Sequence, residues 1–135
     1  MIDAPEKSSI IRMFHVHRNY GPKKALIDIT LDIAKNEFVF ISGPSGAGKT
    51  TLLKLLYLGE PVSEGQILID GINLARIPRK RIPLLRRKFG VIFQDYKLIP
   101  TKSVYDNIAL VLEAAGAKKR LIQKKVRNVD RKSVV

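Results

Sequence analysis

The chain has 135 residues, enough for one ordinary domain, and 45% of them are hydrophobic, as in a typical globular protein. It has no cysteine, which excludes disulfides and thiolate metal sites, and no apolar run approaches the roughly 18 residues of a membrane span. The net charge of +13 is unevenly placed, because residues 1–75 hold eight Lys/Arg and eight Asp/Glu whereas residues 76–135 hold seventeen and four.

The basic second part suits an anionic lipid surface, an acidic protein partner or nucleic acid. We favour a simpler interpretation, in which these are solvated helix faces whose acidic complement lies in sequence not present here. The second interpretation is that the basic residues form a face directed toward a membrane. Nucleic acid is the least favoured partner, because no aromatic residues are interleaved with the basic ones.

The sequence pattern of residues 10–34 predicts an antiparallel sheet. Residues 1–9 are expected to be a flexible tail. A strand is predicted over residues 10–17, with His15 on the same face as the apolar residues before it. Tyr20-Gly21-Pro22 marks a turn, and residues 27–34 alternate apolar with polar, as in a strand with one wet face.

A glycine-rich loop follows a fully apolar run. Phe38 to Ser42 is apolar on both faces, as expected for a buried parallel strand, and residues 51–58 are helix-like. Between them, Gly43-Pro44-Ser45-Gly46-Ala47-Gly48-Lys49-Thr50 has the form G-x-x-x-x-G-K-T. Strand, glycine loop and helix in this order are what a phosphate-binding P-loop requires.

The residue types in this loop fit a nucleoside triphosphate with magnesium. Glycines let successive backbone N–H groups curl around an anion, and the positive end of the next helix points at the same place. Lys49 would add a mobile charge for the β- and γ-phosphates, and the Thr50 hydroxyl is placed to ligate Mg²⁺.

The second part of the sequence reads as alternating helices and strands. A hairpin is predicted around Asp70-Gly71, and Ser103 is expected to cap a helix with Asp106 at its third position. The remaining predicted elements are a basic helix over 79–88 with Pro83 in its first turn, an apolar strand over 89–93, helices over 103–115 and 117–128, and an irregular end over 129–135.

Around the P-loop the sequence resembles the ATP-binding-cassette (ABC) ATPases, over nearly all of residues 11–127. The resemblance is carried by Tyr20 ahead of the loop, Ala25-Leu26-x-Asp28, Gly43 to Leu53, Gly65-x-Ile67, and Gln94 after it. It implies an α/β P-loop NTPase core, truncated, with an antiparallel β subdomain at the N-terminus. Residues 10–128 would form the half of the domain that holds the P-loop and the glutamine loop.

The resemblance also implies roles for individual residues. The nucleotide-binding set would be Tyr20, stacking on adenine, together with Gly43, Pro44, Ser45, Gly46, Ala47, Gly48, Lys49, Thr50 and Thr51 around the phosphates. Gln94 would contact Mg²⁺, alongside Thr50, and the attacking water. The loop after Gln94 would meet a membrane partner. The implied cofactors are ATP and Mg²⁺.

The segment from Arg81 to Leu98 and the run Val104 to Ile108 are similar to the cell-division ATP-binding subunits of this family. These pair with a permease-like integral membrane protein, act as homodimers and sit on the cytoplasmic face of the inner membrane. The alternatives are the ATPase of a lipoprotein-release system or of another ABC transporter, or a fragment that binds ATP without turnover.

Several family motifs are missing from the 135 residues. There is no Leu-Ser-Gly-Gly-Gln signature, no apolar strand ending in Asp-Glu and no histidine after the P-loop. His15 and His17 are expected to be strand residues. The resemblance therefore predicts that this chain holds ATP but does not hydrolyse it alone, and that the strand before the P-loop lacks sheet neighbours and exposes apolar edges.

Overall fold

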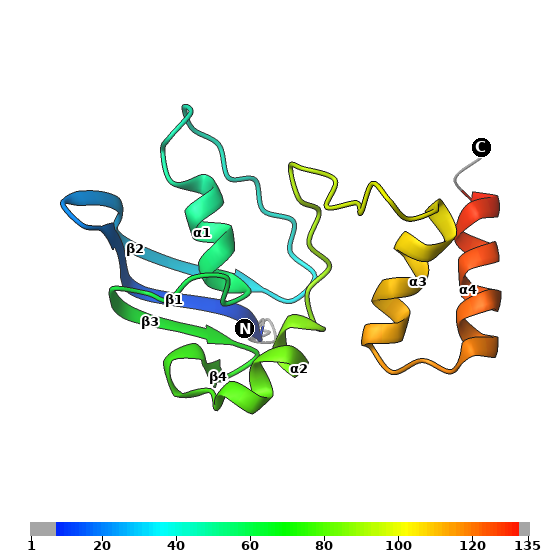
Figure 1. The fold of residues 1–135 in the computed structure, drawn as a ribbon. Helices are drawn as coiled ribbons and strands as arrows, with labels where there is room; N and C mark the ends of the chain where they lie inside the picture. The colour runs from blue at the N-terminus through cyan, green and yellow to red at the C-terminus, as the bar shows by residue number, and fades with distance from the viewer. Residues whose placement is uncertain (1–7, 133–135) are drawn as a thin grey trace, which may run out of the picture. The chain divides into compact units, whose positions relative to one another are not determined.

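The computed structural model describes residues 8–132, and their side chains up to residue 129 (Figure 1). The chain divides into two compact units, one ending at Gly90 and the other beginning at Val91, and each is described by itself. Most of the tail predicted over residues 1–9 lies outside the described residues, as do the last three residues of the predicted irregular end.

The first unit is built on a four-stranded antiparallel sheet with the order β2-β1-β3-β4. The strands are β1 (Ser9–Tyr20), β2 (Lys23–Ala34), β3 (Glu64–Ile69) and β4 (Ile72–Asn73). Both predicted turns join neighbouring strands, at Gly21-Pro22 and at Asp70-Gly71. The expected antiparallel β subdomain is therefore confirmed.

A bulge in β1 changes which residues face the core. His15 has a φ of 46°, and the pairing with β2 shifts between Met13 and Val16. The extra residue turns His15 outward and Val16 inward, so Val16 is fully buried and the prediction for His15 was wrong. Across the hairpin, His15 Nδ1 lies 2.6 Å from Asp28 Oδ1. Gly65 of β3 lies against the same bulge, where a Cβ would collide with the His15 backbone oxygen.

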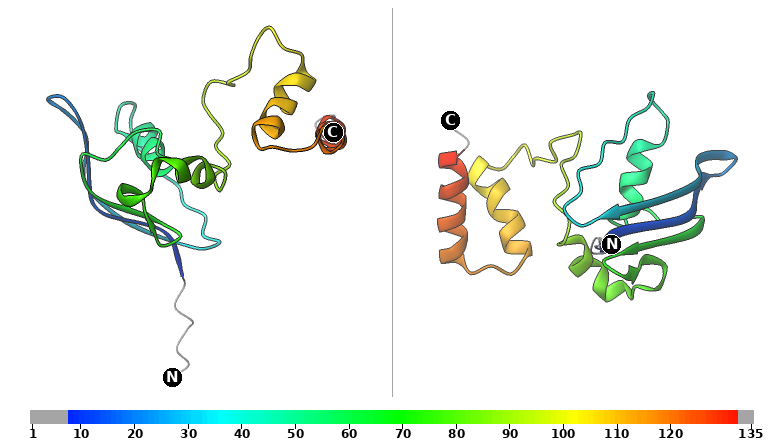
Figure 2. Two further views of the ribbon diagram at one scale, coloured as in Figure 1. Left: turned by 60° about the horizontal axis from the view of Figure 1, so that its bottom comes forward. Right: turned by 180° about the vertical axis from the view of Figure 1, so that it is seen from behind.

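Helix α1 (Lys49–Leu56) covers one face of this sheet (Figures 1 and 2). Short turns η1 (Leu74–Arg76) and η2 (Arg79–Arg81) lead to α2 (Ile82–Arg86), which has Pro83 in its first turn as predicted. The basic helix expected over 79–88 is thus shorter, because its first residues form a tight 3₁₀ turn. The core comprises Met13, Val16, Leu26, Leu52, Leu55, Leu56, Ile67, Ile69, Leu74 and Leu85.

Two predicted strands are absent from the described residues. Neither residues 38–42 nor residues 89–93 form a strand or join the sheet, so both predictions were wrong. A buried parallel strand needs hydrogen-bonded neighbours on both sides, and no described strand pairs with either run. Phe38 and Phe40 are each 85% exposed, in agreement with the expectation that the run before the P-loop lacks sheet neighbours and exposes apolar residues.

The second unit contains an antiparallel helix pair, α3 (Val104–Ala114) and α4 (Lys119–Lys132). Its small core consists of Ala109, Ile122 and Val126. The predicted cap of α3 is confirmed, since Ser103 Oγ accepts a bond from the Asp106 backbone N–H at 3.1 Å. Helix α4 continues past residue 128 to Lys132. Within residues 8–132, no helix combines the length and apolar character needed to span a bilayer.

Candidate functional site

The glycine-rich loop runs from Gly43 to the start of α1 without regular structure. Gly46 and Gly48 have φ values of 80° and 94°, which side-chain-bearing residues rarely adopt. A Cβ on Gly48 would lie 2.5 Å from the backbone oxygen of Ala25 and 2.9 Å from Leu26 Cδ2. The end of the loop therefore packs directly on β2, and only glycine fits there.

The Lys49 side chain folds back across the loop. Its Nζ donates hydrogen bonds of 2.7 Å to the backbone oxygens of both Gly43 and Pro44. Both acceptors are neutral, so neither bond neutralises the ammonium charge. An entering phosphate would offer Lys49 a charged acceptor, which makes a stronger hydrogen bond than a carbonyl.

The first turn of α1 adds further anion-binding groups. The first N–H groups of a helix have no partner within it and carry a partial positive charge. This turn contains no acidic side chain that would compete with an anion. Thr50 is exposed at its second position and Thr51 is half-buried at its third. The fold thus brings the predicted residues 43–51 together in one loop and helix start.

These residues fit a triphosphate with Mg²⁺. The loop offers backbone N–H groups, and Lys49 offers a cation whose present partners are neutral. No cluster of three His, Cys, Asp or Glu able to hold a metal occurs among the described residues. The exposed Thr50 hydroxyl would hold Mg²⁺ together with phosphate oxygens and water, the ligand set that this ion usually takes beside a nucleotide.

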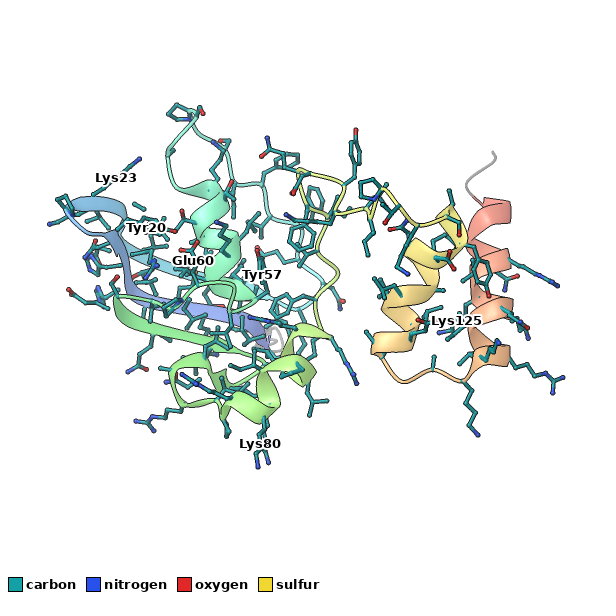
Figure 3. All side chains as sticks on the ribbon, in the orientation of Figure 1. Tyr20, Lys23, Tyr57, Glu60, Lys80 and Lys125 are labelled. Carbon is teal, nitrogen blue, oxygen red and sulfur yellow. The ribbon has the colours of Figure 1, made fainter. Side chains whose placement is uncertain are left out.

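Tyr20 ends β1 and takes part in a cluster of polar side chains. Its hydroxyl donates to Glu60 Oε2, and the Arg18 guanidinium lies 4.6 Å from the centre of its ring. Glu60 Oε1 accepts a 3.0 Å bond from Lys54 Nζ of α1. Figure 3 shows Tyr20 and Glu60 side by side next to α1.

Glu60 is charged in this setting. The hydrogen bond from the Tyr20 hydroxyl, followed by that from Lys54, holds the pKa of Glu60 below its usual value. In return, the Glu60 carboxylate raises the pKa of Lys54. Sequence reasoning missed Glu60 and Arg18. Arg18 stands two residues before Tyr20 on the same strand and Glu60 follows the P-loop helix, but each is an ordinary surface residue by pattern alone.

Gln94 belongs to the second unit. It lies exposed in a bend after the apolar residues Val91 to Phe93. Next to it, Asp95 pairs with Lys97, and that hydrogen bond lowers the pKa of Asp95. The contacts of Gln94 with Mg²⁺ and water stay a prediction.

A G-x-x-x-x-G-K-T loop whose Lys-Thr opens a helix is the mark of a P-loop nucleotide-binding domain. The chain belongs to the ABC transporter family, whose sequence model matches residues 26–135. This agrees with the fold class predicted from the sequence.

Relatives and solved structures match most of this chain. It is 46% identical to the cell division ATP-binding protein FtsE of Bacillus subtilis, over 89% of this chain and 53% of that protein. It is 44% identical to the spermidine/putrescine import ATP-binding protein PotA of Bacteroides thetaiotaomicron, over 90% of this chain and 25% of that protein. A dimeric ATP-binding cassette bound to ADP and Pi matches with a TM-score of 0.76 and 28% identity, over 87% of this chain and 54% of its own. The chain thus spans about half the length of this FtsE protein.

Proposed function

We propose that the chain binds ATP with Mg²⁺ through residues 43–51 and presents Tyr20 to the adenine. The observation that carries this proposal is the Lys49 ammonium, held over the P-loop by two neutral carbonyls at the N-terminus of α1. The whole protein would be the ATP-binding subunit of an ABC-type complex in bacterial cell division. Its similarity to FtsE supports that role.

In that complex, a permease-like integral membrane protein would receive the effect of ATP binding and hydrolysis. Two ATPase subunits would face each other, and the solved cassette that this chain resembles is dimeric. The subunit would lie on the cytoplasmic face of the cell membrane. Gln94 would contact Mg²⁺ and the attacking water in the whole protein.

A second candidate is the ATPase of an importer, which the similarity to PotA favours. The two candidates share the nucleotide site and differ in the membrane partner. Purifying the tagged whole protein from membranes and identifying its partner by mass spectrometry separates them. A permease-like division protein supports the first candidate, and a transporter permease supports the second.

Equilibrium dialysis with radiolabelled ATP and Mg²⁺ tests the nucleotide site. Lys49→Ala should weaken binding at least about tenfold, because a charge-assisted contact to phosphate is worth about 1.5–3 kcal/mol. Lys80→Ala is the matched control, since Lys80 is exposed on η2 (Figure 3). Equal binding by all three proteins would contradict the proposal.

The same preparations test turnover. We expect no phosphate release above background, because no Asp-Glu strand or signature sequence is present in the 135 residues to polarise water or complete the site. Phosphate release that disappears in Lys49→Ala would show that this expectation is wrong.

A further inference from the structure

We propose that Glu60 is the residue that positions Tyr20 for the adenine base, by joining the end of β1 to the P-loop helix α1. The inference rests on the proposed ATP site and adds a positioning residue to it. Glu60 itself lies in the segment after α1 and is separate from the glycine loop.

Donors from two elements converge on this one carboxylate. Arg18 and Tyr20 of β1 both reach Oε2, Arg18 through Nη2 at 3.3 Å, whereas Lys54 of α1 reaches Oε1 at 3.0 Å. The Glu60 side chain is only 19% exposed. Both carboxylate oxygens are therefore engaged, and the group is shielded enough for these charge-assisted bonds to hold it in one place.

These contacts fix the tyrosine ring. A ring at the end of a strand can turn about two side-chain dihedrals, and ordering it has an entropic cost when a ligand binds. Anchoring the hydroxyl on Glu60 removes most of that freedom before the base arrives. Tyr20 remains 39% exposed, which leaves ring surface for a base.

Arg18 decides which face of the ring is free. Its guanidinium lies 4.6 Å from the ring centre and so covers one face of Tyr20. Arg18 is itself bound to Glu60. Glu60 thus fixes both the ring and the cation behind it, and a base stacks on the opposite face.

Glu60 acts on the base end of the site without touching the phosphate end. Within residues 8–132, Lys49 Nζ bonds to the backbone oxygens of Gly43 and Pro44, whereas Lys54 is the residue of α1 whose side chain reaches Glu60. Removing the carboxylate should therefore weaken recognition of the base and spare the phosphate cradle. A residue that merely held the fold together would weaken both.

Equilibrium dialysis of the whole chain separates these possibilities, with ATP–Mg²⁺ and inorganic tripolyphosphate–Mg²⁺ as probes. Glu60→Ala should lower ATP affinity by about threefold to tenfold, part of the value of a base stacked on an aromatic ring, with tripolyphosphate affinity unchanged. Glu60→Gln keeps one acceptor oxygen and should recover part of the loss. Glu64→Ala, an exposed glutamate of β3, is the matched control and should bind both probes as wild type does.

A double-variant cycle tests the contact itself. Tyr20→Phe keeps the ring but removes the hydroxyl that Glu60 accepts. The double variant Tyr20→Phe with Glu60→Ala should lose less ATP-binding free energy than the sum of the losses of the two single variants, because both changes break the same hydrogen bond. Additive losses would overturn the inference.

The remaining outcomes are also decisive. If Glu60→Ala binds both probes with wild-type affinity, or if its affinities for ATP and tripolyphosphate fall by the same factor, Glu60 does not position the base. If wild type binds tripolyphosphate but shows no preference for ATP, the inference fails and the phosphate site stands. If wild type binds neither probe, the proposed function and this inference fail together.

Discussion

Among single residues, Gly48 sets how closely the P-loop approaches the sheet. It combines a φ of 94° with a backbone oxygen only 2.5 Å from the place of a Cβ. Gly46 has a similar φ of 80° but open space around it. The two glycines therefore separate the effect of backbone strain from the effect of steric overlap.

Gly48→Ala should destabilise the first unit more than Gly46→Ala. Left-handed backbone costs a residue with a side chain about 1–2 kcal/mol at either position. Overlap with the Ala25 backbone adds roughly 1–3 kcal/mol at position 48 alone. Urea unfolding followed by circular dichroism measures the difference. Equal losses for the two variants would mean that the loop can move away from β2.

The Glu60 cluster predicts a pH dependence of stability. The pKa of Glu60 is lower in the fold than its ordinary value of 4.5 in the unfolded chain, so its ionised form stabilises the fold above that ordinary value. That contribution is lost as the pH falls through the lowered value. The difference in unfolding free energy between wild type and Glu60→Gln should therefore be constant near neutral pH and shrink in acid. A difference that does not change with pH would contradict this assignment.

At the scale of elements, Asn107 fastens the segment before α3 to the helix. Its Oδ1 accepts from the Ile99 N–H at 2.8 Å, and its Nδ2 reaches the backbone oxygens of Ile99, Lys102 and Ser103 at 3.0–3.2 Å. One amide thus supplies hydrogen-bond partners to backbone groups of the irregular segment 99–103, which has no regular ladder of its own.

Asn107→Ala should loosen the second unit. Leaving the Ile99 N–H without its Asn107 partner costs about 1–3 kcal/mol, which is large for a unit with three buried core residues. Hydrogen exchange of the α3 amides measures the loss. Asn128→Ala, exposed on α4, is the control. Equal protection of α3 in both variants would show that the segment is held by other contacts.

Elements that depend on local chemistry were predictable from the sequence. The Asp70-Gly71 hairpin and the Ser103 cap follow from residues within a few positions of each other. The structure of the runs 38–42 and 89–93 could not be predicted in this way, because a parallel strand exists only if distant segments pair with it. The P-loop was recognisable for the same local reason as the hairpin. Glu60 was not, because its partners Arg18 and Tyr20 lie about forty residues away.

For the whole molecule, the most exposed apolar surface of the first unit lies just before the P-loop. Phe38 and Phe40 stand edge to face, with ring centres 5.4 Å apart, and no strand covers them among the described residues. An extended apolar run with unpaired backbone invites pairing with another chain. Apolar side chains are more stable when buried than in water, so the exposed run that contains Phe38 and Phe40 is the least favourably solvated part of the first unit.

We therefore expect the chain to self-associate through this run. Phe38→Ser with Phe40→Ser should lower the apparent mass at high concentration, because it removes two exposed rings and leaves the core cluster of the first unit intact. Light scattering after gel filtration, repeated over a wide range of concentrations, measures this. Tyr96→Ser is the matched control, since Tyr96 is an equally exposed aromatic residue outside the run. If both variants associate as wild type does, the contact between chains lies elsewhere. If only the control reduces it, the second unit carries the contact.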